Sequence, residues 1–445
     1  MRARSFIPGF VVLILTGLII SASTSPAAAG TVTMSWEASA DEDSSGYVVY
    51  YGTRPGDYAV QVDVGDATAW QVPDLPGGTY YLAVRAYNAD HELGEFSDEV
   101  TAELDGPRPS HRVPRLMDLN GDGRDDVTLF DQKSGRYVMA LSTRRSGFST
   151  SAGQWIRGWQ VTNLNLDGDG SADFVLYNPA DGKWTQAVRR GGMFQYTSGQ
   201  WIGGGSVHAA DLNGDGLDDL VFYHTPTGQL FTALNRAAGE FAFLPGAGPP
   251  NAELYAGRFD DDDATDVLFY DKQSGAWLMA LSDGQGGLRD VPGEAAPGWN
   301  VHVGRLDGDR RDDVFLYQPE TGAWAEGRGA GAGLFSYRQG TWVPSLTLGL
   351  ADFDGDRVDD VLAYNPESGQ GAVCFPSEAD FVCRGSQFPA GGAPAIGDLN
   401  GDGVNDVLIY QADTGTAFRY VTLAPGEFRE STARWEAGLR VIGRF

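Results

Sequence analysis

Asp211-Leu212-Asn213-Gly214-Asp215-Gly216-Leu217-Asp218-Asp219 is one of seven copies of a nine-residue loop that set the spacing of the chain after residue 110. The copies begin at Asp118, Asn165, Asp211, Arg258, Arg305, Asp352 and Asp398, in steps of 46 or 47 residues. A period of this length is typical of propellers and solenoids. We number the loops 1 to 7 in chain order and the positions within each loop 1 to 9.

The loop places oxygen-bearing side chains at positions 1, 3, 5 and 9 around a glycine at position 6. A hard cation that takes several oxygen ligands at about 2.3–2.6 Å suits this pattern, and calcium is the natural candidate. An EF-hand would need a bidentate Glu at position 12 and flanking helices. Position 12 is instead Leu129, Phe222 or Ile409 inside an apolar run, which excludes an EF-hand.

Five loops are predicted to bind calcium, so we expect about five structural ions. Loops 1, 3 and 7 carry the full ligand set: Asp118, Asn120, Asp122, Asp126; Asp211, Asn213, Asp215, Asp219; Asp398, Asn400, Asp402, Asp406. Loop 2 has Asn165 at position 1 and keeps Asp167, Asp169 and Asp173. Loop 6 keeps Asp352, Asp354, Asp356 and Asp360. Its position 6 is Arg357, where a positive φ favours glycine, so weaker binding is expected there. The alternative is that these loops are Asx turns with solvated acids.

Loops 4 and 5 begin with arginine instead of Asp or Asn. Arg258 precedes Asp260, Asp262 and Asp266, and Arg305 precedes Asp307, Asp309 and Asp313. A guanidinium among three carboxylates would supply positive charge through charge-assisted hydrogen bonds. We therefore predict that these two loops bind no metal.

The residues after each loop predict a buried strand and a hairpin. Position 9 is always Asp, and an apolar run ending in an aromatic follows it, as in Val267-Leu268-Phe269-Tyr270. Such a run indicates a strand buried on both faces. A glycine follows the aromatic by five residues in every copy and marks a hairpin turn. Two further strands and the strand before the loop give four antiparallel strands per repeat, and radial repetition of such sheets makes a β-propeller.

The loop, the strand after it and the Gly257-Arg258-Phe259-Asp260 entry resemble FG-GAP or VCBS repeats, the blades of the integrin α-subunit head. The resemblance covers residues 111–445. It implies an all-β, seven-bladed propeller of four-stranded antiparallel blades with calcium loops between the first and second strands. The segment 439–445 matches one more entry strand, so it either closes the ring or belongs to an incomplete eighth blade. We favour seven blades, because closure removes exposed sheet edges.

Residues 30–104 alternate as short strands separated by turns rich in Gly, Pro and Asp, which predicts a small antiparallel sandwich. They resemble a fibronectin type III domain through Trp36, the turn 75–80 ending in Tyr80, and the strand around Val84. No Arg-Gly-Asp tripeptide is present, so adhesion through that motif is not predicted. Residues 105–110 form a short Pro-rich linker.

Residues 1–29 have the layout of a secretory signal peptide: Arg2 and Arg4, an apolar stretch, and small residues ending at Ala29. A retained membrane anchor is the alternative, but the apolar run is short for a span. Removing residues 1–29 changes the formal charge from −28 to −30, which disfavours nucleic-acid binding. We expect the protein to be secreted, on the cell surface or in a periplasm. We also expect it to have no membrane span after cleavage of the signal peptide and to be monomeric.

The cysteines and histidines form no recognisable catalytic motif. Cys374 and Cys383 are the two cysteines and predict a local disulfide in an exported chain. His208 and His302 fall at the same place in their repeats and are interpreted as strand residues. No HExxH or GxSxG motif occurs, so we predict that the chain is not an enzyme.

Several tryptophans precede or follow the blade connections: Trp155, Trp159, Trp201, Trp342 and Trp435. They could stack on sugar rings, but packing between blades is the interpretation we favour. The leading hypothesis is a calcium-binding, non-enzymatic adhesion protein whose propeller face binds an extracellular protein or polysaccharide. The alternatives are a carbohydrate-active enzyme, such as a polysaccharide lyase, and a lectin on the same scaffold.

Overall fold

A computed structural model describes residues 30–39, 43–52, 55–56, 58, 60–75, 78–104, 116–143, 147–237, 240–377 and 380–442. The predicted signal peptide, the predicted linker and part of the turn 75–80 lie outside these residues. The chain divides into two compact units, Met1–Ser110 and His111–Phe445. No helix within the described ranges is long and apolar enough to cross a membrane.

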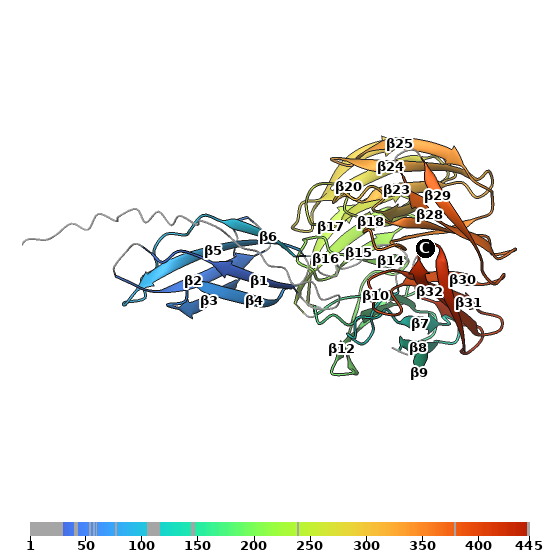
Figure 1. The fold of residues 1–445 in the computed structure, drawn as a ribbon. Coiled ribbons are helices and arrows are strands. Elements are labelled where there is room, and N and C mark those ends of the chain that lie inside the picture. Colours follow the sequence, from blue (N-terminus) through green and yellow to red (C-terminus); the bar gives the residue numbers. More distant parts are fainter. Residues whose placement is uncertain are drawn as a thin grey trace, which may run out of the picture. The chain divides into compact units, whose positions relative to one another are not determined.

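The first unit contains two antiparallel sheets (Figure 1). One pairs β1 (Gly30–Ser35) with β4 (Ala69–Leu75). The other has the order β3 (Val60–Gly65), β2 (Ser44–Gly52), β5 (Gly78–Asn88), β6 (Val100–Leu104). Their common core includes Trp36, Tyr80 and Val84, on which the resemblance rests, and it is made of Met34, Trp36, Tyr47, Val49, Tyr80, Leu82, Val84 and Ala102. Residues 30–104 therefore form a small β-sandwich.

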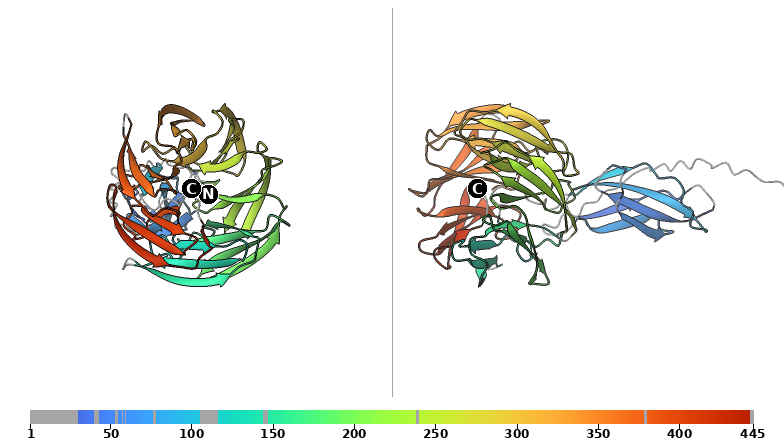
Figure 2. Two further views of the ribbon diagram at one scale, coloured as in Figure 1. Left: turned by 90° about the vertical axis from the view of Figure 1, so that its right-hand side faces the viewer. Right: turned by 180° about the vertical axis from the view of Figure 1, so that it is seen from behind.

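The second unit is a β-propeller. Its described residues form seven four-stranded antiparallel sheets, one per repeat, arranged around a common axis (Figure 2). Blade 1 has the order β34 (Arg440–Val441), β7 (Val127–Phe130), β8 (Arg136–Ser142), β9 (Phe148–Gln154). Blades 2 to 4 are β10 (Gln160–Leu164), β11 (Asp173–Tyr177), β12 (Lys183–Arg190), β13 (Met193–Gln200); β14 (Ser206–Ala210), β15 (Asp219–His224), β16 (Gln229–Ala237), β17 (Glu240–Ala247); and β18 (Glu253–Gly257), β19 (Asp266–Tyr270), β20 (Ala276–Ser282), β21 (Leu288–Glu294).

Blades 5 to 7 repeat the same order. They are β22 (Asn300–Gly304), β23 (Asp313–Tyr317), β24 (Ala323–Gly331), β25 (Leu334–Thr341); β26 (Thr347–Ala351), β27 (Asp360–Tyr364), β28 (Gln370–Pro376), β29 (Phe381–Gln387); and β30 (Ala393–Gly397), β31 (Asp406–Gln411), β32 (Thr416–Ala424), β33 (Glu427–Arg434). In blades 2 to 7 the first strand leads into the nine-residue loop, and in blade 1 the loop directly precedes β7. All seven loops therefore lie on one face, which we call the loop face.

The C-terminal strand closes the ring. Arg440 and Val441 pair with Phe130 and Leu129 of β7, and the Ile442 N–H donates to the Thr128 carbonyl at 2.8 Å. Residues 440–441 thus supply the innermost strand of blade 1. Of the two sequence-based alternatives, closure with seven blades is confirmed.

The second strand of each blade is buried on both faces, as predicted. In six blades a buried tyrosine lies at or next to the end of this strand, and its hydroxyl donates to a carbonyl of the connection leading to the next blade, at 2.5–2.7 Å. Blade 1 has Phe130 there and lacks this bond. The predicted hairpin glycines are confirmed: Gly322 has φ 75°, and a Cβ there would lie 2.1 Å from the Trp342 carbonyl oxygen.

The predicted disulfide is present. Cys374 on β28 and Cys383 on β29 lie directly opposite each other and are bonded. The bond staples the two outer strands of blade 6.

Candidate metal centre

The seven loops are joined to one another around the propeller. In every loop the backbone N–H of position 8 donates to the position-1 carbonyl of the preceding blade, and blade 1 follows blade 7. The pairs are Asp125 to Asp398 (2.7 Å), Ala172 to Asp118 (2.8 Å), Asp218 to Asn165 (2.8 Å), Thr265 to Asp211 (2.6 Å), Asp312 to Arg258 (2.5 Å), Asp359 to Arg305 (2.5 Å) and Asn405 to Asp352 (2.9 Å). Backbone hydrogen bonds thus link each loop to the loops of both neighbouring blades.

Acidic side chains at position 8 add a second bond to four of these joints. The carboxylates of Asp125, Asp218, Asp312 and Asp359 accept the position-1 N–H of the preceding loop at 2.6–2.9 Å. These residues are absent from the predicted ligand set because only the fold places them against the neighbouring blade. Their role is to hold adjacent blades together.

Position 9 is a buried carboxylate with backbone partners. One oxygen accepts the N–H of position 2 in all seven loops, at 2.6–3.1 Å. In six blades the other oxygen accepts an N–H from the end of the third strand, at 2.6–2.9 Å. In blade 6 the corresponding residue is Pro376, which has no N–H. These aspartates thus anchor the loop to the sheet, in addition to any metal role.

Burial raises the pKa of the position-9 carboxyls, and neighbouring loop carboxylates raise it further. The pKa is raised to about 7 for Asp126 and about 8 for Asp219, against the lowering effect of the backbone hydrogen bonds. For Asp360, which lacks the second backbone donor, it is raised to about 9. A cation in the loop would favour the ionised form.

Position 1 shapes the loop itself. The carboxylates of Asp118, Asp211, Asp352 and Asp398 accept the backbone N–H of position 6 at 2.7–2.9 Å. In these loops position 6 has a positive φ, and Arg357 adopts it with φ 71°, as the sequence predicted. The loops therefore fold as Asx turns through their own hydrogen bonds. This geometry is what the Asx-turn interpretation expects, and it is compatible with a bound ion.

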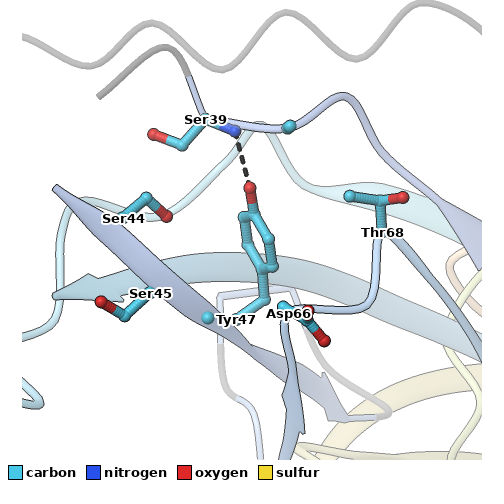
Figure 3. Close-up of a pocket in the computed structure, with 8 residues that line it drawn as sticks. Ser39, Ser44, Ser45, Tyr47, Asp66 and Thr68 are labelled. Atoms are coloured by element: carbon cyan, nitrogen blue, oxygen red, sulfur yellow. Dashed lines mark hydrogen bonds between the residues drawn. The ribbon is translucent and has the colours of Figure 1, made fainter. Parts of the chain in front are cut away.

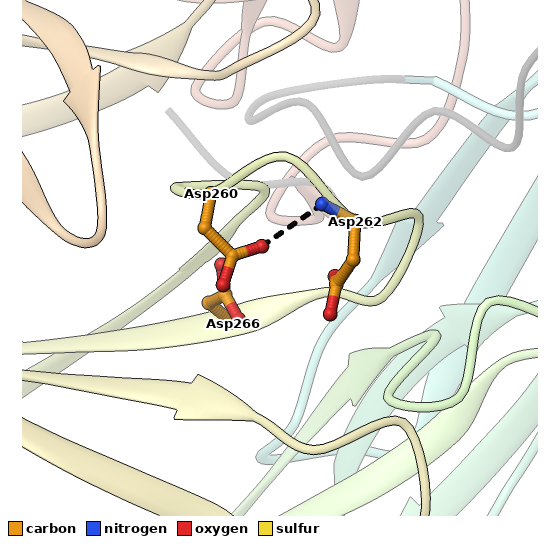
Figure 4. A group of neighbouring side chains, drawn as sticks. All are labelled: Asp260, Asp262 and Asp266. Carbon is orange, nitrogen blue, oxygen red and sulfur yellow. Dashed lines mark hydrogen bonds between the residues drawn. The ribbon is translucent and has the colours of Figure 1, made fainter.

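Two triplets of carboxylates gather closely enough to share an ion. They are Asp260, Asp262 and Asp266 of loop 4 (Figure 4) and Asp352, Asp354 and Asp356 of loop 6, and the oxygens within each triplet lie within 4.8 Å of one another. Ligand oxygens at about 2.4 Å from a calcium ion are at most about 5 Å apart. The donor chemistry and spacing of these residues fit such an ion.

Loop 4 differs from the sequence-based expectation. Arg258 does not lie among Asp260, Asp262 and Asp266; its guanidinium is 3.5 Å from Asp263 at position 6. Arg305 also turns away, donating to the Arg357 carbonyl of loop 6 at 2.9 Å. Both guanidiniums instead contact acceptors outside the three predicted carboxylates of their own loop. The proposed neutralisation of loops 4 and 5 by these two arginines is therefore not the observed geometry.

In loops 1, 2, 3 and 7, predicted ligands form hydrogen bonds or ion pairs with one another or with nearby arginines. The position-3 amides of Asn213 and Asn400 donate to the position-5 carboxylates at 2.8 Å, and that of Asn120 donates to Asp126 at 3.1 Å. Asp122 pairs with Arg124, and Asp167 lies 3.2 Å from Arg190. An ion in these loops would have to displace such contacts.

Among the described residues, His302 does not contribute to a polar site. It is buried, and burial lowers its pKa to about 4, which fits its interpretation as a neutral strand residue.

The first unit has a shallow polar depression of about 210 Å³, where the Ser39 N–H donates to the Tyr47 hydroxyl at 2.7 Å (Figure 3). Its lining includes Ser39, Ser44, Ser45, Asp66 and Thr68.

The tryptophans at the blade connections pack within the propeller. Trp155, which follows blade 1, has its ring centroid 5.2 Å from that of Phe174 in blade 2, and Trp201, which follows blade 2, lies 5.8 Å from Phe231 in blade 3. Trp435 of blade 7 contacts Phe148 of blade 1 at 5.0 Å. The packing interpretation is confirmed for these residues.

No family model and no curated protein matches the sequence. The structure resembles a lectin from Agrocybe aegerita, described as recognising non-reducing terminal N-acetylglucosamine, with a TM-score of 0.56 and 12% identity over 72% of this chain and 91% of that one. Proteins from Lactobacillus plantarum (TM-score 0.49, 13% identity, 71% of this chain and 99% of that one) and Desulfotomaculum acetoxidans (0.49, 12%, 71% and 98%) also match. At this identity the first likeness supports the fold alone.

Proposed function

We propose that the chain is a secreted, calcium-stabilised, non-enzymatic binding protein whose propeller binds an extracellular polysaccharide or glycan. In this proposal the repeats belong to the FG-GAP or VCBS type, and the first unit is a fibronectin type III module that serves as an accessory domain. The carboxylate triplets of loops 4 and 6 would hold ions as structural ligands, and the predicted ligands of loops 1, 2, 3 and 7 would hold further ions.

The observation that carries the calcium part is the triplet Asp352, Asp354 and Asp356, whose oxygens lie within 4.8 Å of one another in a loop hydrogen-bonded to both neighbours. Three carboxylates at this spacing repel each other, and a divalent cation with oxygen ligands relieves the repulsion. Because the loops are joined, an ion in one would stiffen the ring. This points to a structural use of calcium, with recognition carried by another surface.

The face opposite the loop face supports a binding role. It carries the blade connections, where Ile156, Ile202 and Val343 each directly follow a packed tryptophan and are 54%, 40% and 65% exposed. Apolar groups presented at repeated positions of a rigid ring suit contact with an extended ligand. Carbohydrate is the ligand class to test first, because a lectin shares the fold.

A glycan array probed with residues 30–445 in calcium tests this proposal. We expect binding to a restricted set of glycans and at least tenfold weaker signal for Ile202→Ser together with Val343→Ser. Leu423→Ser, an equally exposed change near the loop face, should leave the signal unchanged. Absence of glycan binding by a folded, calcium-loaded protein would contradict the carbohydrate proposal, and depolymerisation of a bound polysaccharide would contradict the non-enzymatic one.

A further inference from the structure

Loops 3 and 7 have the same first six residues but different buried surroundings. Residues 211–216 and 398–403 both read Asp-Leu-Asn-Gly-Asp-Gly. The third strand of each blade passes beneath its loop. Thirteen residues after position 9, blade 3 has Thr232 and blade 7 has Arg419, whereas blade 1, whose loop is of the same type, has Met139. Blade 7 therefore carries a cation where its two counterparts carry neutral side chains.

Arg419 is held against loop 7 from the side of the core. It is 1% exposed, and its Nη2 donates to the Leu399 carbonyl at 2.6 Å. Leu399 lies between the predicted ligands Asp398 and Asn400, and its N–H donates to the predicted ligand Asp406 at 3.1 Å. The guanidinium is thus hydrogen-bonded directly to the backbone of loop 7, between two predicted ligands.

The rest of the guanidinium lacks a full set of partners. Nε and Nη1 have no hydrogen-bond acceptor among the described residues, and Cζ lies 5.6 Å from the centroid of the Phe148 ring of blade 1. Burial lowers the pKa of Arg419, and the charges of Asp406 and Asp398 raise it. A buried guanidinium is retained when nearby carboxylates compensate its charge. The compensation here comes from loop 7.

We propose that Arg419 is the resident cation of loop 7 and lowers its calcium affinity well below that of loop 3. The proposal rests on the proposed function, because it assumes that loops of this type bind calcium. A fixed positive charge in a water-poor interior repels a divalent ion strongly at the distance of a neighbouring side chain. The Arg419 guanidinium already supplies positive charge near Asp398 and Asp406, as a calcium ion would.

This assignment also changes which loops are expected to be neutralised within the protein. The sequence pattern pointed to Arg258 and Arg305, which begin their loops, but both turn away from the carboxylates. In loop 7 the cation instead comes from the third strand of the same blade, thirteen residues after Asp406, and donates to the Leu399 carbonyl. Such an arrangement is visible only in the folded blade.

The test is calcium titration of residues 30–445 by calorimetry, with ion counting by native mass spectrometry, for the unaltered protein, Arg419→Met and Arg434→Met. Met is the residue of blade 1 at this place. Arg434 is exposed on β33, so its variant removes one positive charge from the same blade without touching loop 7. We expect Arg419→Met to bind one additional ion at limiting calcium, at least tenfold more tightly than loop 7 of the unaltered protein, and Arg434→Met to behave as the unaltered protein.

A double variant, Arg419→Met with Asp402→Ala, assigns the added ion to loop 7 and should lose it. Equal ion counts and affinities for the unaltered protein and a folded Arg419→Met would overturn the inference while leaving the calcium proposal intact. If the unaltered protein binds no ion, loop 3 binds none either, and both the inference and the wider calcium proposal fail, whatever Arg419→Met binds. No binding by either protein overturns both.

Discussion

At the scale of single residues, the position-9 aspartate explains why the loop keeps its shape in every blade although other positions vary. Asp126 and Asp266 belong to loops with different first residues, Asp118 and Arg258, yet both accept the same two backbone N–H groups. A carboxylate so bonded fixes the start of the second strand. This is a physical reason for its presence in all seven copies that does not depend on an ion.

Arg357 gives a prediction at this scale. Its φ of 71° is strained for a residue with a Cβ, and glycine relieves the strain. We expect Arg357→Gly to raise the free energy of unfolding by about 0.5–1 kcal/mol, measured by urea denaturation. The matched control is Arg310→Gly at position 6 of loop 5, where φ is not positive. That change should destabilise, and a gain in both variants would refute the explanation.

Several features of individual residues could be predicted from the sequence. The positive φ at Arg357 followed from its alignment with glycines, and the disulfide followed from two cysteines in an exported chain. The orientation of Arg258 could not be predicted, because a long side chain reaches several acceptors at similar cost. Asp312 was missed as a contact to the preceding blade because its partner lies 54 residues away.

At the scale of elements, the joints between loops connect one blade to the next. Each joint combines a backbone hydrogen bond with, in four cases, an acidic side chain at position 8. Strand order and hairpins were predictable from local pattern, since each blade repeats the same turn chemistry. The joints were not, because they connect segments about one repeat apart.

Removing one side-chain joint tests their energetic role. Asp312 is 7% exposed and accepts the Arg258 N–H at 2.9 Å. Asp312→Ala leaves that N–H without this acceptor, and we expect a loss of about 1–3 kcal/mol in the free energy of unfolding. Asp261→Ala removes an exposed partner of Arg311 and should cost less than about 1 kcal/mol. Similar losses in the two variants would show that position 8 has no special role.

At the scale of the whole molecule, the ring depends on a short closing strand. Only Arg440 and Val441 pair with β7, whereas the first strands of the other blades contribute five residues each. Deleting residues 439–445 removes the buried Leu439 and uncovers the edge of β7. We expect a lower melting temperature and concentration-dependent association through that edge. A truncated protein that stays monomeric with an unchanged melting temperature would contradict this account of closure.

The buried position-9 carboxyls make stability depend on pH. Their folded pKa values, raised to about 7 for Asp126 and Asp406 and about 9 for Asp360, lie above the unfolded value of 3.8. The folded state therefore holds protons that the unfolded chain has released, and stability falls as pH rises through this range. In a chelator we expect a lower free energy of unfolding at pH 8 than at pH 5. Calcium should reduce the difference, and greater stability at pH 8 without calcium would contradict the prediction.

Calcium-dependent thermal unfolding of residues 30–445, with ions counted by native mass spectrometry, tests the central claim most directly. The account predicts a large rise in melting temperature on adding calcium to chelator-treated protein, because ions that bind only the folded ring stabilise it. It also predicts that bound ions are present in the loaded sample. An unchanged melting temperature with no ions bound would mean that the seven loops are Asx turns alone and that the propeller needs no metal.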